Sequence, residues 1–163
     1  MDRYDQVLVA LRRIIRATDL HSKKLSKTSG LTAPQLLILQ TLREQSDLTV
    51  GEVAKKVSLS QATVTTIVDR LERGGYVYRE RGTADKRKVY VYLTDKAFAT
   101  LVDAPKPLQD NFVQQFQDLH DWEQTMILAS LERVAYMMDA QHIDAAPVLD
   151  IGALDRNEAA KNQ

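Results

Sequence analysis

The chain has 163 residues, of which 44% are hydrophobic and 27% charged, a composition typical of a folded rather than a disordered protein. It contains no cysteine, which excludes disulfides, thiolate metal sites and switches based on cysteine oxidation. No apolar run approaches 18 residues and the N-terminus lacks the build of a signal peptide, so we expect no membrane partner and a cytoplasmic location.

The net charge is zero, but the charged residues are unevenly distributed. Residues 1–29 and 52–93 each carry a net charge of +4, residues 30–51 carry −1 and residues 94–163 carry −7. Because local charge decides where a polyanion can dock, the basic middle of the chain is the region to examine for a polyanion-binding motif.

The N-terminal third of the chain predicts two helices. Apolar residues at helical spacing favour a first helix from Tyr4 to about residue 27, and Gly30 follows the break in the pattern. Thr32 and Gln35 form a capping box that begins a second helix, with Pro34 in its first turn.

The next segment predicts two short helices joined by a tight turn. Thr49 and Glu52 fit a second capping box, and residues 58–60 form the turn. A helix over Gln61–Arg73 then carries an apolar face at the spacing i, i+3, i+4, i+7, formed by Val64, Ile67, Val68 and Leu71.

The remainder predicts a β-hairpin and further helices. Residues 76–81 and 88–93 alternate like strands around a turn-rich, basic tip. Thr94 caps another helix, which Pro105 and Pro107 should break. We expect a last helix capped by Asp121 and Gln124, running to about residue 140, with one apolar side directed inward: Met126, Ile127, Leu131, Val134, Ala135 and Met138. Residues 147–151 are expected to be ordered, and residues 155–163 to form a frayed tail.

The two short helices and the basic hairpin together have the pattern of a winged helix-turn-helix. In the DNA-binding version, the N-terminal end of the second helix faces base edges in the major groove. Glutamine can pair with adenine, hydroxyls are permissive, and methyl groups can contact thymine. Between Ser60 and Ile67 there is no acidic residue to repel phosphate. The expected contacts here are Ser58, Ser60, Gln61, Ala62, Thr63, Thr65, Thr66, Arg70 and Arg73.

The hairpin tip supplies a second group of expected DNA contacts. A basic loop beside a major-groove helix suits the minor groove, whose narrow walls concentrate negative potential. The alternative interpretation is a solvated helix face followed by a charged surface turn. The expected wing contacts are Asp85, Lys86, Arg87 and Lys88.

The segments Leu59–Val77, Asp85–Lys88 and Leu93–Lys96 resemble the MarR family of winged-helix regulators. The resemblance covers about residues 4–140. It implies a mainly α fold with a small β-hairpin wing: a helix-turn-helix at about 49–73, a wing at about 76–93, dimerisation helices at about 4–27 and 95–140, and a C-terminal extension at 141–163.

The resemblance also implies a function for the chain. The protein would bind double-stranded DNA as a homodimer and act, most commonly, as a repressor. Arg87 would enter the minor groove, and Asp85 would brace it through an ion pair. The chain has Ala62 where many members have proline, and Gly74-Gly75 where one glycine is usual.

Family members often bind a small-molecule effector between their dimerisation and DNA-binding parts. By this resemblance, the polar candidates here are Arg16, His21, Lys24 and Gln35. The extension over residues 143–152 resembles that of regulators of ectoine and other compatible-solute genes. An osmotic effector could be a zwitterion such as glycine betaine, held by an aromatic cage. A phenolic or other aromatic acid is the rival effector.

Two other classes of function are alternatives to this interpretation. The sequence contains no glycine-rich phosphate loop, nucleophile elbow or metal-ligand motif, so we expect no enzyme, cofactor or metal. The histidines His21, His120 and His142 are isolated in the sequence, which disfavours a zinc sensor. A winged helix that binds proteins would keep the fold, but its partner would not be DNA.

Overall fold

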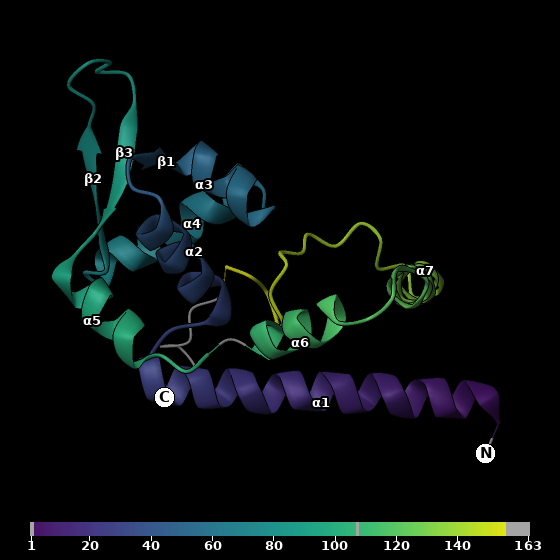
Figure 1. Cartoon of the computed structure of the whole chain (residues 1–163). Helices are drawn as coiled ribbons and strands as arrows, with labels where there is room; N and C mark the ends of the chain where they lie inside the picture. Colours follow the sequence, from purple (N-terminus) through teal and green to yellow (C-terminus); the bar gives the residue numbers. More distant parts are fainter. Residues whose placement is uncertain (1, 107, 156–163) are drawn as a thin grey trace.

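The computed structural model describes residues 2–106 and 108–155 and has a mainly helical architecture with one antiparallel sheet of three short strands (Figure 1). The predicted fold class is therefore confirmed. The elements in chain order are α1 (Arg3–Ser29), α2 (Ala33–Glu44), β1 (Leu48–Thr49), α3 (Val50–Val57), α4 (Gln61–Arg73), β2 (Val77–Arg81), β3 (Val89–Leu93), α5 (Asp95–Asp103), α6 (Leu108–Gln117) and α7 (Asp121–Met137).

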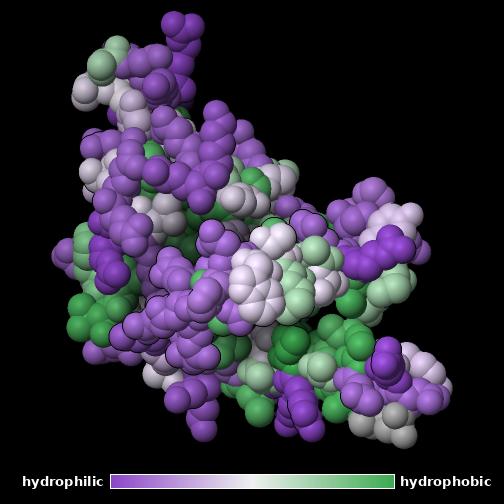
Figure 2. Space-filling view, turned by 45° about the vertical axis from the view of Figure 1, so that its right-hand side comes forward, coloured by the Kyte–Doolittle hydropathy of each residue, from purple (hydrophilic) through white to green (hydrophobic). Residues whose placement is uncertain are grey.

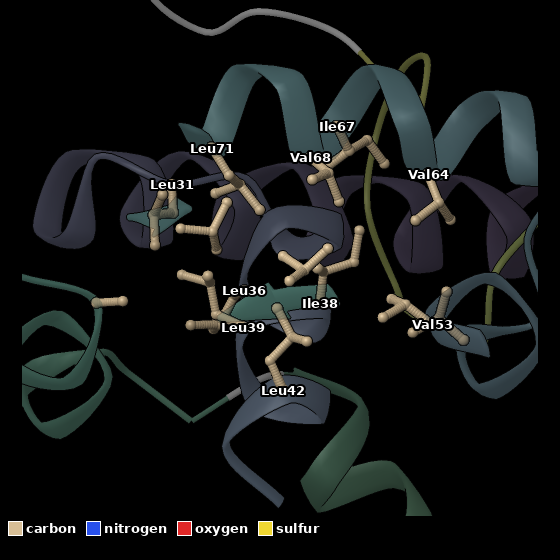
Figure 3. Close-up of a cluster of buried hydrophobic side chains, with 14 of the residues drawn as sticks. Leu31, Leu36, Ile38, Leu39, Leu42, Val53, Val64, Ile67, Val68 and Leu71 are labelled. Carbon is tan, nitrogen blue, oxygen red and sulfur yellow. The ribbon is translucent and has the colours of Figure 1, made fainter. Parts of the chain in front are cut away.

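The core lies between α2, α3 and α4, with the sheet closing one side. The strands are ordered β1-β3-β2, so β3 is central, and its Val91 pairs with Leu48 and Arg79. Each buried aliphatic side chain stabilises this packing by roughly 1.5–3 kcal/mol. Figure 3 shows the centre of the cluster, which includes Leu36, Ile38, Leu39, Val53, Val64, Ile67, Val68 and Leu71.

Hydrogen-bonded caps fix where the helices begin in the winged part, which we define as the chain from α2 to β3. The predicted boxes of Thr32 with Gln35 and of Thr49 with Glu52 are both present, and the backbone N–H of Thr49 donates to Glu52 Oε2 at 2.7 Å. Ser60 caps α4 by accepting from the N–H of Thr63 at 3.2 Å. These local contacts set the starting residues of α2, α3 and α4.

Two local predictions need correction. The capping box of α7 consists of His120 and Glu123, not Asp121 and Gln124: the N–H of His120 donates to Glu123 Oε2 at 2.9 Å, because the helix begins one residue earlier than expected. The amide of Gln124 donates instead to backbone carbonyls of the preceding turn. Strand β1 was not expected, since two residues are too few to show a period of two.

The helices outside the winged part leave their apolar faces exposed. Figure 1 shows α1 as a long helix along the base of the molecule, with α6 beside it and α7 seen end-on. Met126, Leu131 and Met138 were expected to point inward but are exposed. Periodicity identifies an apolar face, but it does not tell whether the same chain covers that face. A hollow of about 450 Å³ lies between α1 and α6 and is partly lined by α7.

The end of the described chain folds back onto the winged part. After α7 an irregular segment returns toward α1 and α4 (Figure 1), and Ala146, Val148 and Leu154 pack against the core cluster. Residues 147–151 are expected to be ordered, and the packing of Val148 against the core cluster agrees with this expectation. The tail expected at residues 155–163 lies outside the described residues from 156 onward, and Pro107 also lies outside them. The predicted break in the helix is present between Asp103 and Leu108.

Candidate nucleic-acid interface

The turn between α3 and α4 places the start of α4 at the surface. Ser58 ends α3 in the left-handed conformation, with φ of 57°, and the N–H of Leu59 donates to the carbonyl of Ala54 at 3.1 Å. Leu59 is buried, whereas Ser58 and Ser60 are exposed. One buried anchor therefore fixes a turn whose polar residues remain available to a partner.

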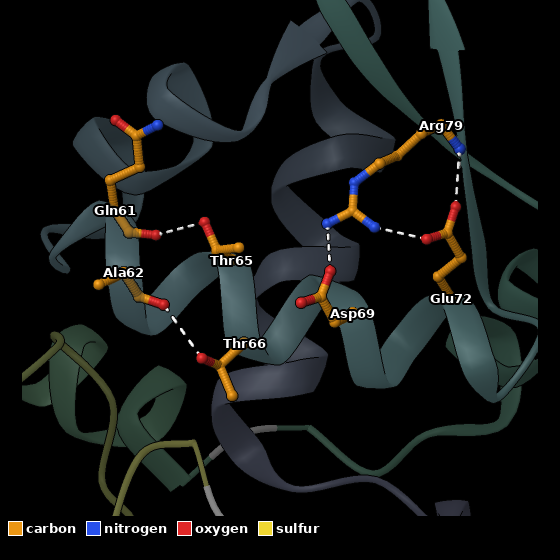
Figure 4. A network of polar contacts seen from close by, with 7 residues as sticks. All are labelled: Gln61, Ala62, Thr65, Thr66, Asp69, Glu72 and Arg79. Atoms are coloured by element: carbon orange, nitrogen blue, oxygen red, sulfur yellow. Dashed lines mark hydrogen bonds and ion pairs between the residues drawn. The ribbon is translucent and has the colours of Figure 1, made fainter.

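The first two turns of α4 present amide, hydroxyl and methyl groups (Figure 4). Gln61 and Ala62 are exposed. The hydroxyl of Thr65 donates to the carbonyl of Gln61 at 2.8 Å, and that of Thr66 to the carbonyl of Ala62 at 3.2 Å. With their protons used in this way, both hydroxyl oxygens can still accept from base amino groups, and both methyl groups are free for apolar contact.

Gln61 lies close to the backbone of α3. A Cβ atom at Gly51 would lie 3.3 Å from Gln61 Oε1, so the absence of a side chain at Gly51 makes room for this amide. Thr63, half-buried, has its hydroxyl 2.8 Å from that of Ser60 and 3.1 Å from Asp144 Oδ2 in the returning C-terminal segment. The contact with Asp144 could not be expected from the sequence, because 81 residues separate the two.

The two arginines of α4 lie in its last turn. Arg70 is half-buried and Arg73 exposed, and both line a pocket of about 580 Å³ together with Gln35 and Tyr76. Within the part of the chain that the structure describes, Arg70 Nη1 is shielded from solvent and has no hydrogen-bond partner. The C-terminal end of α4 can therefore attract an anion. The N-terminal end can do so as well, since its first turn has no acidic residue.

The wing tip carries a cationic side chain that is almost fully exposed to solvent. The Arg87 side chain is 95% exposed, and its Nε lies 3.5 Å from Asp85 Oδ1. The backbone N–H of Arg87 donates to the same oxygen at 3.0 Å. The expected ion pair is thus present, and Lys86 and Lys88 are exposed beside it. A Cβ atom at Gly82 would lie 2.6 Å from the carbonyl oxygen of Asp85, so the tight turn needs glycine there.

Arg79 joins the wing to α4, a role that the sequence analysis missed. Its guanidinium on β2 donates to Asp69 at 2.6 Å and to Glu72, both on α4 (Figure 4). Partial burial opposes the charge, but the hydrogen bonds to Asp69 and Glu72 outweigh it, so the pKa of Arg79 is raised above its ordinary value. The available signal was two acidic residues at i and i+3 on one helix face, followed by an arginine on the next strand.

The four residues proposed for effector binding are not gathered in one place. Arg16 is exposed and pairs with Asp19 at 2.8 Å, Lys24 is exposed, and Gln35 belongs to the capping box of α2. His21 is half-buried. None of the four lines the hollow between α1 and α6. Their role in effector binding stays a prediction.

The described residues, 2–106 and 108–155, also bear on metal binding and on membrane insertion. These residues contain no group of histidine, aspartate and glutamate side chains arranged to hold a metal ion. Among their helices, none combines the length and the apolar character needed to span a bilayer.

A polar helix beside a basic β-wing, both fixed on a helix-turn-helix frame, defines a protein of the winged-helix class, which includes many DNA-binding proteins. The MarR family model matches residues 31–89. The matched segment runs from the start of α2 into β3, so this part of the chain is similar to the MarR family, and the relatives below are similar to the chain over longer stretches. The curated relatives that the chain matches are regulators of transcription, in agreement with the prediction that the chain is not an enzyme.

Two curated relatives illustrate the extent of the similarity. The chain is 28% identical over 130 residues to the HTH-type transcriptional regulator YcgE of Bacillus subtilis, covering 80% of this chain and 84% of the relative. It is 36% identical over 77 residues to the transcriptional regulator MgrA of Staphylococcus aureus, covering 47% of this chain. The match to MgrA spans only 52% of that protein.

Solved structures agree with the fold. A MepR-like protein complexed with pseudoligands is similar with a TM-score of 0.60 and 24% identity, over 85% of this chain and 97% of the other. Reduced AbfR bound to DNA is similar with a TM-score of 0.52 and 26% identity, over 83% of this chain and 94% of the other.

Proposed function

We propose that the chain is a sequence-specific repressor that binds a pseudo-palindromic operator as a homodimer. The observation that carries this proposal is the pairing of a polar α4 N-terminus with a basic wing tip on one rigid frame. In this arrangement α4 reads the major groove through Gln61, Ala62, Thr65 and Thr66, while Arg87 reaches the adjacent minor groove. Arg73 is placed for the phosphate backbone.

The exposed apolar faces of α1, α6 and α7 support the homodimer. A soluble monomer rarely leaves so many large apolar side chains in water. A second copy would cover them and present two α4 helices about one DNA turn apart, which explains the expected symmetry of the operator. The AbfR complex with DNA supports DNA as the partner.

We further propose that the regulated genes serve the response to osmotic stress. The support is the resemblance of residues 143–152 to the extension of regulators of compatible-solute genes. The effector would then be a zwitterion such as glycine betaine; an aromatic acid, the commoner inducer in the family, is the alternative. Salicylate, ectoine and glycine betaine can be compared directly for release of bound DNA.

Fluorescence anisotropy with the DNA upstream of the protein's own gene, measured over a salt series, tests the function. Arg87→Ala should weaken binding and reduce the salt slope by about one unit per wing, because one phosphate-neutralising charge is lost from each. Arg13→Ala removes the same charge from an exposed position on α1 and should leave the slope unchanged. The absence of wild-type binding even at low salt would favour a winged helix that binds proteins instead of DNA.

A further inference from the structure

The C-terminal strap, which we define as residues Ile143–Leu154, is attached to the molecule at several points. Ala146, Val148 and Leu154 pack against the core cluster of the winged part. The hydroxyl of Ser22 on α1 donates to Asp150 Oδ1 at 2.7 Å. In Figure 1 the segment runs from the end of α7 back toward the junction of α1 and the winged part. The strap is therefore a docked segment with both apolar and polar attachments.

The strap brings a carboxylate to the N-terminal end of α4. Asp144 Oδ2 accepts a hydrogen bond from the hydroxyl of Thr63 at 3.1 Å. Thr63 is the third residue of α4, and its N–H is bound by the capping hydroxyl of Ser60. The N-terminus of a helix carries a partial positive charge, so a carboxylate is favoured there.

The hydroxyl of Thr63, which donates to Asp144, is a group that DNA would also contact. A phosphate oxygen and a carboxylate oxygen are both anionic acceptors, and both are stabilised at a helix N-terminus. The strap contains Asp144 and Asp150 but no lysine or arginine, whereas the first turn of α4 has no acidic residue. With Thr63 donating to Asp144, its proton is not available to an operator.

We propose that the C-terminal strap is an autoinhibitory element that competes with DNA for the N-terminal end of α4. This inference rests on the proposed function, since it assumes that α4 is the DNA-reading helix. In the free protein Asp144 holds Thr63, and the apolar contacts and Ser22 keep the strap in place. Operator DNA must displace Asp144 to reach Thr63, and this lowers the affinity that the wing and α4 would otherwise provide.

Operator binding by full-length variants tests this competition. Asp144→Ala should bind DNA about three- to tenfold more tightly than the wild type, the range expected for the loss of one competing charge-assisted hydrogen bond at an exposed site. Ser22→Ala loosens the strap at a position outside α4 and should also bind more tightly, by about two- to threefold. Asp118→Ala changes the net charge equally, lies exposed between α6 and α7, and should bind like the wild type.

A second readout follows the strap itself. Because the chain has no cysteine, Ala145→Cys gives a single exposed position for a fluorescent label. Operator DNA should increase the local mobility of this label, and adding the Asp144→Ala change should increase it without DNA. A label that keeps the same mobility in both cases would overturn the proposal.

The two proposals fail in different ways. If the wild type binds DNA in an Arg87-dependent manner but Asp144→Ala and Asp118→Ala bind equally, the strap does not compete and only this inference is overturned. If no variant binds DNA at low salt, the DNA-binding function fails, and the proposed competition fails with it.

Discussion

Arg79 is the residue through which the wing and α4 hold one another. Its side chain is only 23% exposed, and its guanidinium bridges Asp69 and Glu72, one turn apart on α4. In the proposed complex with DNA, the position of the wing relative to α4 determines whether Arg87 and Gln61 can reach adjacent grooves at the same time. The same bridge neutralises two carboxylates that would otherwise face a polyanion.

Replacing Arg79 by methionine keeps most of its length but removes both hydrogen bonds. We expect the free energy of unfolding to fall by about 1–2 kcal/mol, more than for an isolated surface pair, because one partly buried guanidinium serves two carboxylates. Arg79→Lys should recover only part of the loss, since an ammonium lacks the planar fork. Urea unfolding measures the effect. Arg81→Met, exposed on the same strand, is the control, and equal unfolding midpoints for Arg79→Met and Arg81→Met would contradict the bridge.

At the scale of elements, the sequence predicted most of the winged part and little of its long-range contacts. The boxes at Thr32 and Thr49 and the apolar face of α4 are local signals, because every partner lies within one or two turns. The bridge from Arg79 and the contact of Asp144 with Thr63 join residues far apart in sequence, and no local pattern encodes such a pairing. The same limit explains the difference at α7, whose apolar face is expected from the sequence to point into the core but is largely exposed.

The start of α3 should make stability depend on pH. The N–H of Thr49 and, secondarily, its hydroxyl donate to Glu52 and lower the pKa of that carboxyl below its ordinary value of 4.5. The unfolded state therefore binds a proton at a higher pH than the folded state. The stabilisation is complete above the ordinary pKa and is lost as the pH falls through the lowered pKa of the folded state.

Glu52→Gln should flatten this acid limb. The amide oxygen still accepts from Thr49, but it does not titrate, so the variant should lose less stability than the wild type when the pH is lowered from 6 toward 3. Thermal unfolding followed by circular dichroism at several pH values measures the difference. Glu132→Gln, on an exposed position of α7 outside the capping box, should keep the wild-type profile. Identical acid limbs for wild type and Glu52→Gln would refute the assignment.

At the scale of the whole molecule, polar and apolar surfaces are segregated. Figure 2 shows hydrophilic side chains dominating the wing end of the face in view, and hydrophobic ones gathered in its lower half. Most of the large exposed apolar side chains belong to α1, α6 and α7, and Phe98 and Val102 on α5 are exposed as well. Large exposed side chains there include Leu8, Ile14, Ile15, Phe112, Trp122, Met126, Leu131 and Met137. This distribution fits a protein in which one end contacts DNA and the other end contacts a second copy of the chain.

This division predicts that light scattering will give a mass of twice 18.4 kDa at micromolar concentration. Leu8, 59% exposed on α1, lies on the surface that a second copy would cover, so Leu8→Glu should bury an unpaired carboxylate in the dimer and shift the mass toward one chain. Operator affinity should fall in parallel, because two linked α4 helices bind more tightly than one. Tyr78→Glu places the same charge on an exposed aromatic of the wing and should leave the mass unchanged. A wild-type mass of one chain would overturn the dimer, and with it the expectation that a single protein molecule reads both halves of a symmetric operator.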